Sequence, residues 1–259
     1  MRSIRVGRVF GIEVRVHWTI VVIFGLFVWD FATLALPKIV PGYTTAVYWT
    51  VSALATAAFI VTLAAHEMSH SYVARRQGIA VRDVTLWMLG GVATIEGTPA
   101  RPRDECAIAA AGPAVSAAIG VFGTVAGIAA AAVGVPRVAA AGILWVAMFN
   151  LLLAVFNLVP AAPLDGGRIL RSWLWHRSGD RARATVTTAR AGEAFAGVLL
   201  FAGAAELAIG GDAGGLWMLA VGWFLLHAAR GERRAACRDS SPGYPGTLCP
   251  PRTPTSSVQ

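Results

Sequence analysis

The sequence predicts an all-α polytopic membrane protein with about six transmembrane helices and a small β-strand or hairpin element between helices 2 and 3. Of its 259 residues, 56% are hydrophobic and only 14% are charged, a composition typical of membrane proteins and not of soluble domains. Several apolar stretches also approach the roughly 20 residues that a helix needs to cross a bilayer core of about 30 Å. The predicted spans are residues 17–36, 48–74, 105–133, 138–159, 191–209 and 214–229.

The distribution of basic residues predicts the orientation of these spans. Membrane proteins concentrate Lys and Arg in their cytoplasmic segments. If the N-terminus lies inside, the outside segments contain only Lys38 and Arg137 of the 22 basic residues. We therefore expect a multi-pass protein of the cell (cytoplasmic) membrane with both termini in the cytoplasm. The net charge of +8 then reflects topology and lipid headgroups, and no nucleic-acid partner is expected.

A cluster of ionisable residues interrupts the second apolar span near its inner end. The segment LAAHEMSHSYVARR places His66, Glu67 and His70 within one turn of the predicted helix. Side chains four residues apart share a helix face, so the two imidazoles can converge on one metal ion with the carboxylate beside them as a general base. Ionisable groups at membrane depth are costly and therefore indicate function. The pattern HExxH is typical of zinc proteases.

A third metal ligand is expected after the fourth span, at Asp165 in the segment NLVPAAPLDGGR. A hydrolytic zinc site needs three protein ligands and one open position. The prolines and glycines of this segment predict irregular backbone, which is tolerated at membrane depth only where it lines an interior. Because the second and fourth spans both run from outside to inside, the histidine pair and Asp165 are expected in the same leaflet, so the active site should face the cytoplasmic side.

Two further patterns are open to both a structural and a functional interpretation. The segment VRDVTLWMLGGVATIEG is β-branched, aromatic and interrupted by glycine, which predicts short strands. Its residues Gly90, Gly91 and Val92 could receive an unwound substrate by β-addition, or the segment could be a plain structural hairpin. In the third span, Gly112, Ser116, Gly120 and Thr124 form a four-residue stripe, which we interpret as helix packing.

Together these segments resemble the site-2 protease family of intramembrane zinc metalloproteases (peptidase M50 type). The resemblance rests on HEMSH at 66–70, NLVPAAPLDGG at 157–167, and the stretches LGGVATIEG and AAGPAVS. It implies one Zn²⁺ per chain held by His66, His70 and Asp165, with Glu67 activating water. It also implies a transition-state or substrate-positioning role for Asn157, for which an interhelical hydrogen bond is the structural alternative, and a local helix break at Gly112–Pro113.

The resemblance also gives a domain division and a substrate class. We expect a cytoplasmic N-terminal basic segment (1–16), an intramembrane metalloprotease domain (17–230) and a disordered Pro/Ser-rich cytoplasmic tail (231–259), without evident CBS or PDZ domains. This pattern resembles the bacterial branch of the family. The implied partners are the lipid bilayer and single-span membrane protein substrates, with anti-sigma factors as the family-based expectation.

Two other classes of function remain open on the sequence. A divalent-metal transporter also places His, Glu and Asp within helices, but transporters usually show internal repeats and a charged conduit, which this sequence lacks. A catalytically inactive membrane scaffold would have no need to retain Glu67.

Overall fold

The computed structural model describes residues 3–9, 11–88, 90–210 and 213–239. The chain divides into two compact units, Met1–Asn157 and Leu158–Gln259. Of the predicted disordered tail (231–259), residues 231–239 form the end of a helix, so the prediction is wrong for them; residues 240–259 lie outside the described residues.

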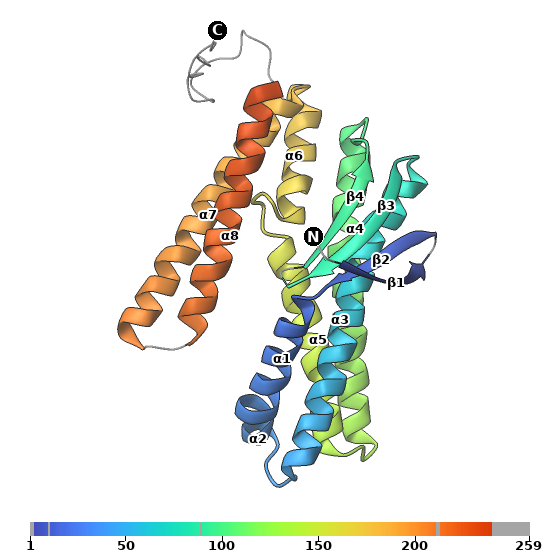
Figure 1. Ribbon diagram of the computed structural model, residues 1–259, viewed down its shortest axis with the longest axis vertical. Helices are drawn as coiled ribbons and strands as arrows, with labels where there is room; N and C mark the ends of the chain where they lie inside the picture. Colours follow the sequence, from blue (N-terminus) through green and yellow to red (C-terminus); the bar gives the residue numbers. More distant parts are fainter. Residues whose placement is uncertain (1–2, 10, 89, 211–212, 240–259) are drawn as a thin grey trace. The chain divides into compact units, whose positions relative to one another are not determined.

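The first unit contains the helices that carry the first four predicted spans (Figure 1). The helix α3 begins where the side chain of Thr44 accepts a hydrogen bond from the backbone of Val47, which satisfies one of the unpaired N–H groups of the first turn. The helices are α1 (Ile20–Asp30), a π-helical turn (Phe31–Ala35), α2 (Leu36–Ile39), α3 (Thr45–Arg76), α4 (Pro102–Ala132) and α5 (Arg137–Asn157).

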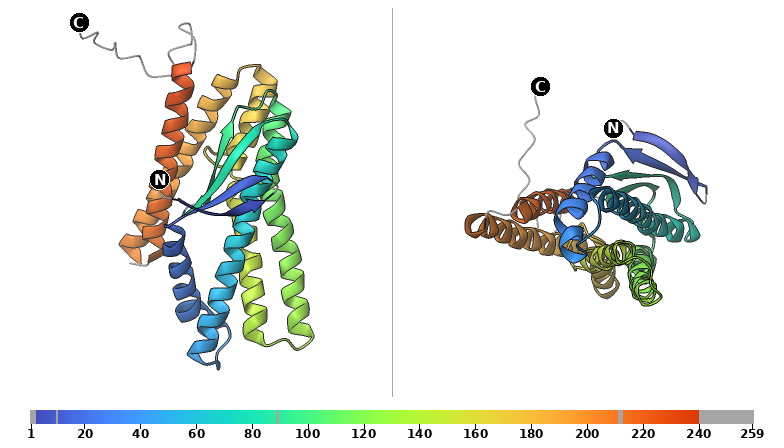
Figure 2. Two further views of the ribbon diagram at one scale, coloured as in Figure 1. Left: turned by 45° about the vertical axis from the view of Figure 1, so that its right-hand side comes forward. Right: turned by 90° about the horizontal axis from the view of Figure 1, so that it is seen from below.

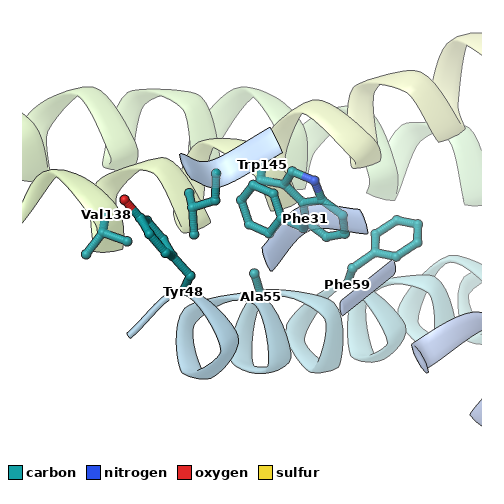
Figure 3. Packing of buried hydrophobic residues seen from close by; sticks show 7 residues of the cluster. Phe31, Tyr48, Ala55, Phe59, Val138 and Trp145 are labelled. Atoms are coloured by element: carbon teal, nitrogen blue, oxygen red, sulfur yellow. The ribbon is translucent and has the colours of Figure 1, made fainter. Parts of the chain in front are cut away.

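An aromatic cluster joins the π-helical turn, α3 and α5 (Figure 3). Phe31 stacks on Trp145 with ring centroids 4.8 Å apart, and Phe59 meets Trp145 edge-on at 6.0 Å. Aromatic pairs in these geometries contribute about 0.5–1.5 kcal/mol beyond the area that they bury. The cluster packs against the N-terminal half of α3, the helix that carries the two histidines in its C-terminal half.

The predicted hairpin is present, and it belongs to a larger sheet of four strands. The strands are β1 (Ser3–Val9), β2 (Ile12–His17), β3 (Ala80–Trp87) and β4 (Gly90–Glu96), in the order β1-β2-β3-β4. The pairs β1–β2 and β3–β4 are antiparallel, whereas β2 and β3 are parallel. The strands β1 and β2 lie in the N-terminal segment, where the sequence analysis expects only a basic stretch.

The parallel pair constrains the path of the first two spans. The strand β2 ends just before α1 and β3 begins just after α3, so both ends of this helical hairpin return to one sheet. The sheet packs beside α3 and α4 (Figure 2) through the buried side chains of Ile12, Met68, Val84 and Ile108. Met68 lies between the two histidines in the sequence, so this core holds the sheet against the HExxH turn.

The second unit consists of α6 (Asp165–Ser178), α7 (Arg181–Ile209) and α8 (Ala213–Asp239). The helix α6 ends at Gly179, which adopts a left-handed conformation with φ of 70°, as is common after a helix C-terminus. Ion pairs join the helices: Arg233 lies 3.0 Å from Glu193, and Arg171 lies 3.3 Å from Glu232.

The predicted fold class is confirmed: the described chain is mostly helical, with one small sheet. Five of its helical segments are long and apolar enough to cross a membrane, namely Ile20–Ile39, Thr45–Arg76, Pro102–Ala132, Arg137–Asn157 and Arg181–Ile209. These match the first five predicted spans, so the chain is a multi-pass membrane protein. The sixth predicted span forms most of α8 but is not among these five.

The expected helix break at Gly112–Pro113 is wrong. The helix α4 continues through Pro113, which is buried within it. A proline removes one backbone hydrogen bond and crowds the carbonyl four residues earlier. Here the preceding turn consists of small residues, Ala109 to Gly112, and membrane helices tolerate proline where neighbouring helices support the backbone.

Candidate metal centre

The two histidines of the HExxH pattern converge inside the first unit. His66 and His70 are 2% and 7% exposed, and their Nε2 atoms lie 3.3 Å apart. Two nitrogen ligands at the usual zinc distance of about 2.0–2.1 Å in a tetrahedral site are about 3.3–3.4 Å apart. The spacing of the two nitrogens is therefore the spacing that a tetrahedral ion requires.

The helix α4 orients both imidazole rings through contacts with their Nδ1 atoms. Nδ1 of His70 lies 2.7 Å from the backbone carbonyl of Ile108. Because a carbonyl can only accept a hydrogen bond, this nitrogen carries the proton and Nε2 of His70 keeps its lone pair. Nδ1 of His66 lies 2.9 Å from the hydroxyl of Ser116. Ile108 and Ser116 are eight residues apart and share one face of α4.

Gly112, midway between Ile108 and Ser116, forms the floor of this site. A Cβ atom at this position would lie 2.2 Å from Nε2 of His70 and 2.6 Å from Nε2 of His66. Both distances are far below van der Waals contact, so only glycine leaves the space in front of the two nitrogens open. Two neutral imidazoles converge beside Gly112, where any larger residue would fill the space. Such a pair of nitrogen donors is suited to a divalent metal such as zinc.

Glu67 is held by the first residues of β4. The backbone N–H of Gly91 donates a hydrogen bond to Oε1 of Glu67 at 3.1 Å. A Cβ atom on Gly91 would lie 2.4 Å from Cγ of Glu67, and Gly90 has φ of 135°, a conformation that favours glycine. The Gly-Gly pair therefore lets the strand approach the carboxylate closely. The predicted role of Gly90, Gly91 and Val92 in substrate binding stays a prediction.

Asp165 lies in the second unit as the first residue of α6, where it is buried. The preceding segment is tied to α7 by a hydrogen bond from the N–H of Ala162 to the carbonyl of Thr188, 3.2 Å long. A Cβ atom on Gly166 would lie 2.3 Å from the carbonyl oxygen of Leu158, and one on Gly167 would lie 2.5 Å from the backbone of Ala161. The two glycines thus allow the chain to turn sharply into α6. The role of Asp165 as third ligand stays a prediction.

Asn157 is the last residue of α5, in the first unit. Its side-chain amide donates a hydrogen bond to the carbonyl of Leu153 in its own helix, 3.0 Å long. Because this hydrogen bond lies within α5, it is not the interhelical hydrogen bond of the alternative interpretation. The catalytic role of Asn157 stays a prediction.

The contacts of Gly112 and Ser116 of α4 with the two histidines were not predicted from the sequence. The sequence predicts helix packing for Gly112 and Ser116, because small residues at four-residue spacing are typical of helix contacts in lipid. Gly120 fits that interpretation, since a Cβ atom there would lie 2.6 Å from the side chain of Leu151. The available signal was Ser116, the polar member of the stripe nearest to Gly112. The carbonyl of Ile108 leaves no signal in the sequence.

The chain is similar to a peptidase family and to individual known proteins. The model of Peptidase family M50 matches residues 54–140 and 129–200. Two relatives are named as putative zinc metalloproteases. Rip3 of Mycobacterium tuberculosis is 46% identical over 89% of this chain and 58% of its own length, and sll0528 of Synechocystis is 36% identical over 90% and 60%. The chain thus spans a little over half the length of these relatives.

A solved structure, the site-2 protease from Methanocaldococcus jannaschii, is 27% identical to the chain. The match covers 90% of this chain and 96% of that one, with a TM-score of 0.58. The site-2 protease fold expected from the sequence is therefore confirmed.

Proposed function

The chain belongs to peptidase family M50, and on this basis we propose that it is a zinc-dependent intramembrane endopeptidase. It hydrolyses peptide bonds in or near the transmembrane segments of single-span membrane proteins. The observation that carries the proposal is the 3.3 Å approach of the His66 and His70 Nε2 atoms over the open floor at Gly112, with Glu67 in the same helical turn.

The proposed zinc ligands are His66, His70 and Asp165. Two neutral imidazoles and one carboxylate are a common ligand set of hydrolytic zinc sites, which keep a fourth position open. Zinc supplies a Lewis acid that polarises the scissile carbonyl and makes water acidic enough to react near neutral pH. With ionised Glu67 included, the charges of the site sum to zero, which limits the cost of burial in a low-dielectric setting.

Glu67 is the proposed general base and acid. Its carboxylate takes a proton from the attacking water and delivers it to the leaving nitrogen as the C–N bond breaks. One water is consumed, and the products are a new carboxyl group and a new amine. The hydrogen bond from the Gly91 N–H orients the carboxylate for both transfers.

The strand β4 is the proposed binding site for an unwound substrate. It is an end strand of the sheet, and Gly91 lies opposite Leu86 of β3. Because the Gly91 N–H donates to Glu67, it points away from β3, and the backbone of Ala93, two residues on, points the same way. A substrate strand that pairs with Ala93 would continue past Gly91 and bring its next peptide group beside Glu67.

The finer localisation follows from the charge pattern. Both termini and the active site are proposed to face the cytoplasm, and residues 17–230 are proposed to form the protease domain. The substrate class implied by the family resemblance is single-span regulators such as anti-sigma factors.

The test compares wild type with Glu67→Gln on candidate single-span proteins in liposomes, followed by mass analysis of fragments. Glu206→Gln, another glutamate in an apolar helix, is the matched control. We expect cuts within an apolar span from wild type and Glu206→Gln, loss of these cuts in Glu67→Gln, and inhibition by a zinc chelator. Equal cutting by wild type and Glu67→Gln would remove Glu67 from the mechanism. No cutting by any form would favour a scaffold, and metal flux without cutting would favour a transporter.

A further inference from the structure

Ser116 contacts His66 on the side of the ring that faces away from the proposed metal. The hydroxyl is fully buried and lies 2.9 Å from Nδ1 of His66. It belongs to the same face of α4 as Gly112 and Ile108, and these three positions meet the two imidazoles at four-residue intervals. The rigid backbone of α4 therefore controls the positions of both rings.

The tautomer of His66 depends on what the Ser116 hydroxyl does. The carbonyl of Ile108 can only accept, so it fixes the proton of His70 on Nδ1. A hydroxyl can donate or accept, and two arrangements of His66 follow. If Ser116 donates, His66 carries its proton on Nε2 and directs it at Nε2 of His70, 3.3 Å away. If Ser116 accepts, the proton is on Nδ1 and the Nε2 atoms of both rings carry lone pairs on the side of Gly112.

We propose that Ser116 is a positioning residue of the metal centre, which accepts the Nδ1 proton of His66 and so presents the Nε2 lone pair to the metal. Metal-bound histidines almost always donate their other ring N–H to a nearby acceptor, which fixes both the tautomer and the ring orientation. For His70 the backbone does this, whereas for His66 a side chain does. The inference rests on the proposed function, because it takes His66 as a zinc ligand.

The expected effect is on metal affinity as well as on hydrolysis. Loss of such an outer hydrogen bond typically weakens metal binding by about 10–100-fold. Ser116→Ala removes the acceptor with almost no change of volume, so the ring stays in place but can lose its preferred tautomer. Ser116→Thr keeps the hydroxyl and should restore most of the affinity.

The first measurement is zinc affinity in detergent by competition with a chromogenic chelator. We expect the zinc dissociation constant of Ser116→Ala to rise about 10–100-fold over wild type. Ser52→Ala is the matched control, because Ser52 is also a fully buried serine and lies on α3 about 21 Å from His66 at 1.5 Å per residue. This control should bind zinc as wild type does. An unchanged constant in Ser116→Ala would overturn the inference.

The second measurement reads the tautomer in a chain that keeps Ser116. With His17, His176 and His227 replaced by glutamine, only His66 and His70 of the five histidines remain. Long-range ¹H–¹⁵N spectra of the zinc-loaded, ¹⁵N-histidine-labelled chain should show both rings protonated on Nδ1 and coordinated through Nε2. Coordination of His66 through Nδ1 would overturn the inference. Failure of wild type to bind zinc would overturn both the inference and the proposed function. A chain that binds zinc with His66 coordinated through Nδ1 would overturn the inference alone, so the two results are distinguishable.

Discussion

Replacing Gly112 with alanine tests the proposed metal site through a position that is not itself a ligand. The added Cβ would lie 2.2 Å from Nε2 of His70, which is 1.2 Å short of the 3.4 Å at which ordinary van der Waals contact begins. Zinc ligands must keep their bond distances within about 0.2 Å. The rings must therefore move several times farther than the metal tolerates, or α4 must move away from α3.

Movement of the rings and movement of α4 should each cause a large loss of zinc affinity. We expect at least a 100-fold rise in the dissociation constant, about 2.8 kcal/mol at about 1.4 kcal/mol per factor of ten. Overpacking should also lower the free energy of unfolding by about 1–3 kcal/mol. Zinc content and chelator competition measure the first effect, and thermal unfolding in detergent measures the second.

Gly120→Ala provides the matched control for this prediction. A Cβ at Gly120 would lie 2.6 Å from the side chain of Leu151, so this variant overpacks the same helix without touching a histidine. It should lose stability to a similar extent while it binds zinc as wild type does. If Gly112→Ala binds zinc with wild-type affinity, or if both variants lose zinc equally, the placement of the metal over Gly112 is refuted.

Three further predictions concern other parts of the chain. Gly91→Ala should reduce hydrolysis at least tenfold while zinc is retained. The added Cβ would lie 2.4 Å from Cγ of Glu67 and would therefore displace that side chain. Assays of turnover and zinc content on one preparation check this. Asp165→Ala should lower the zinc content below about one ion per chain, because the proposed site loses its charged ligand; elemental analysis checks it, and full zinc retention would contradict it. Reporter fusions after Lys38 and Arg82 should report outside and inside respectively, and the reverse result would invert the proposed topology.

The parts of the structure that the sequence predicted are those with strong local signals. Long apolar runs place the helices α3, α4 and α5 to within a few residues, because burial in lipid and backbone hydrogen bonding both require helix there. The ligand pair His66 and His70 is readable because four-residue spacing in a helix places both side chains on one face. The hairpin of β3 and β4 is readable from its β-branched residues and its glycines.

The parts that the sequence analysis missed depend on tertiary context. In β1 and β2, apolar residues such as Ile12 and Val14 alternate with charged residues such as Glu13 and Arg15, which is a strand period. The arginines of this segment also fit the excess of basic residues expected on the cytoplasmic side, so two patterns overlap there. The partner of β2 is β3, on the far side of two spans, so local patterns cannot reveal the parallel pairing. Ser116 looked like a packing residue because its contact with His66 depends on how α4 meets α3.

The parallel pairing of β2 with β3 has a consequence for the biogenesis of the protein. Glu13 pairs with Asp83, and α1 and α3 lie between them in the chain. Because of this chain order, β1 and β2 are synthesised long before their partner β3. A two-stranded hairpin alone is at best marginally stable in water, so β1 and β2 are not stably folded during this interval. They must wait at the membrane surface until α1 and α3 have both inserted and β3 has been synthesised. The sheet then joins the two ends of this helical hairpin. The first described residues of the chain therefore fold stably only after its first two spans have inserted.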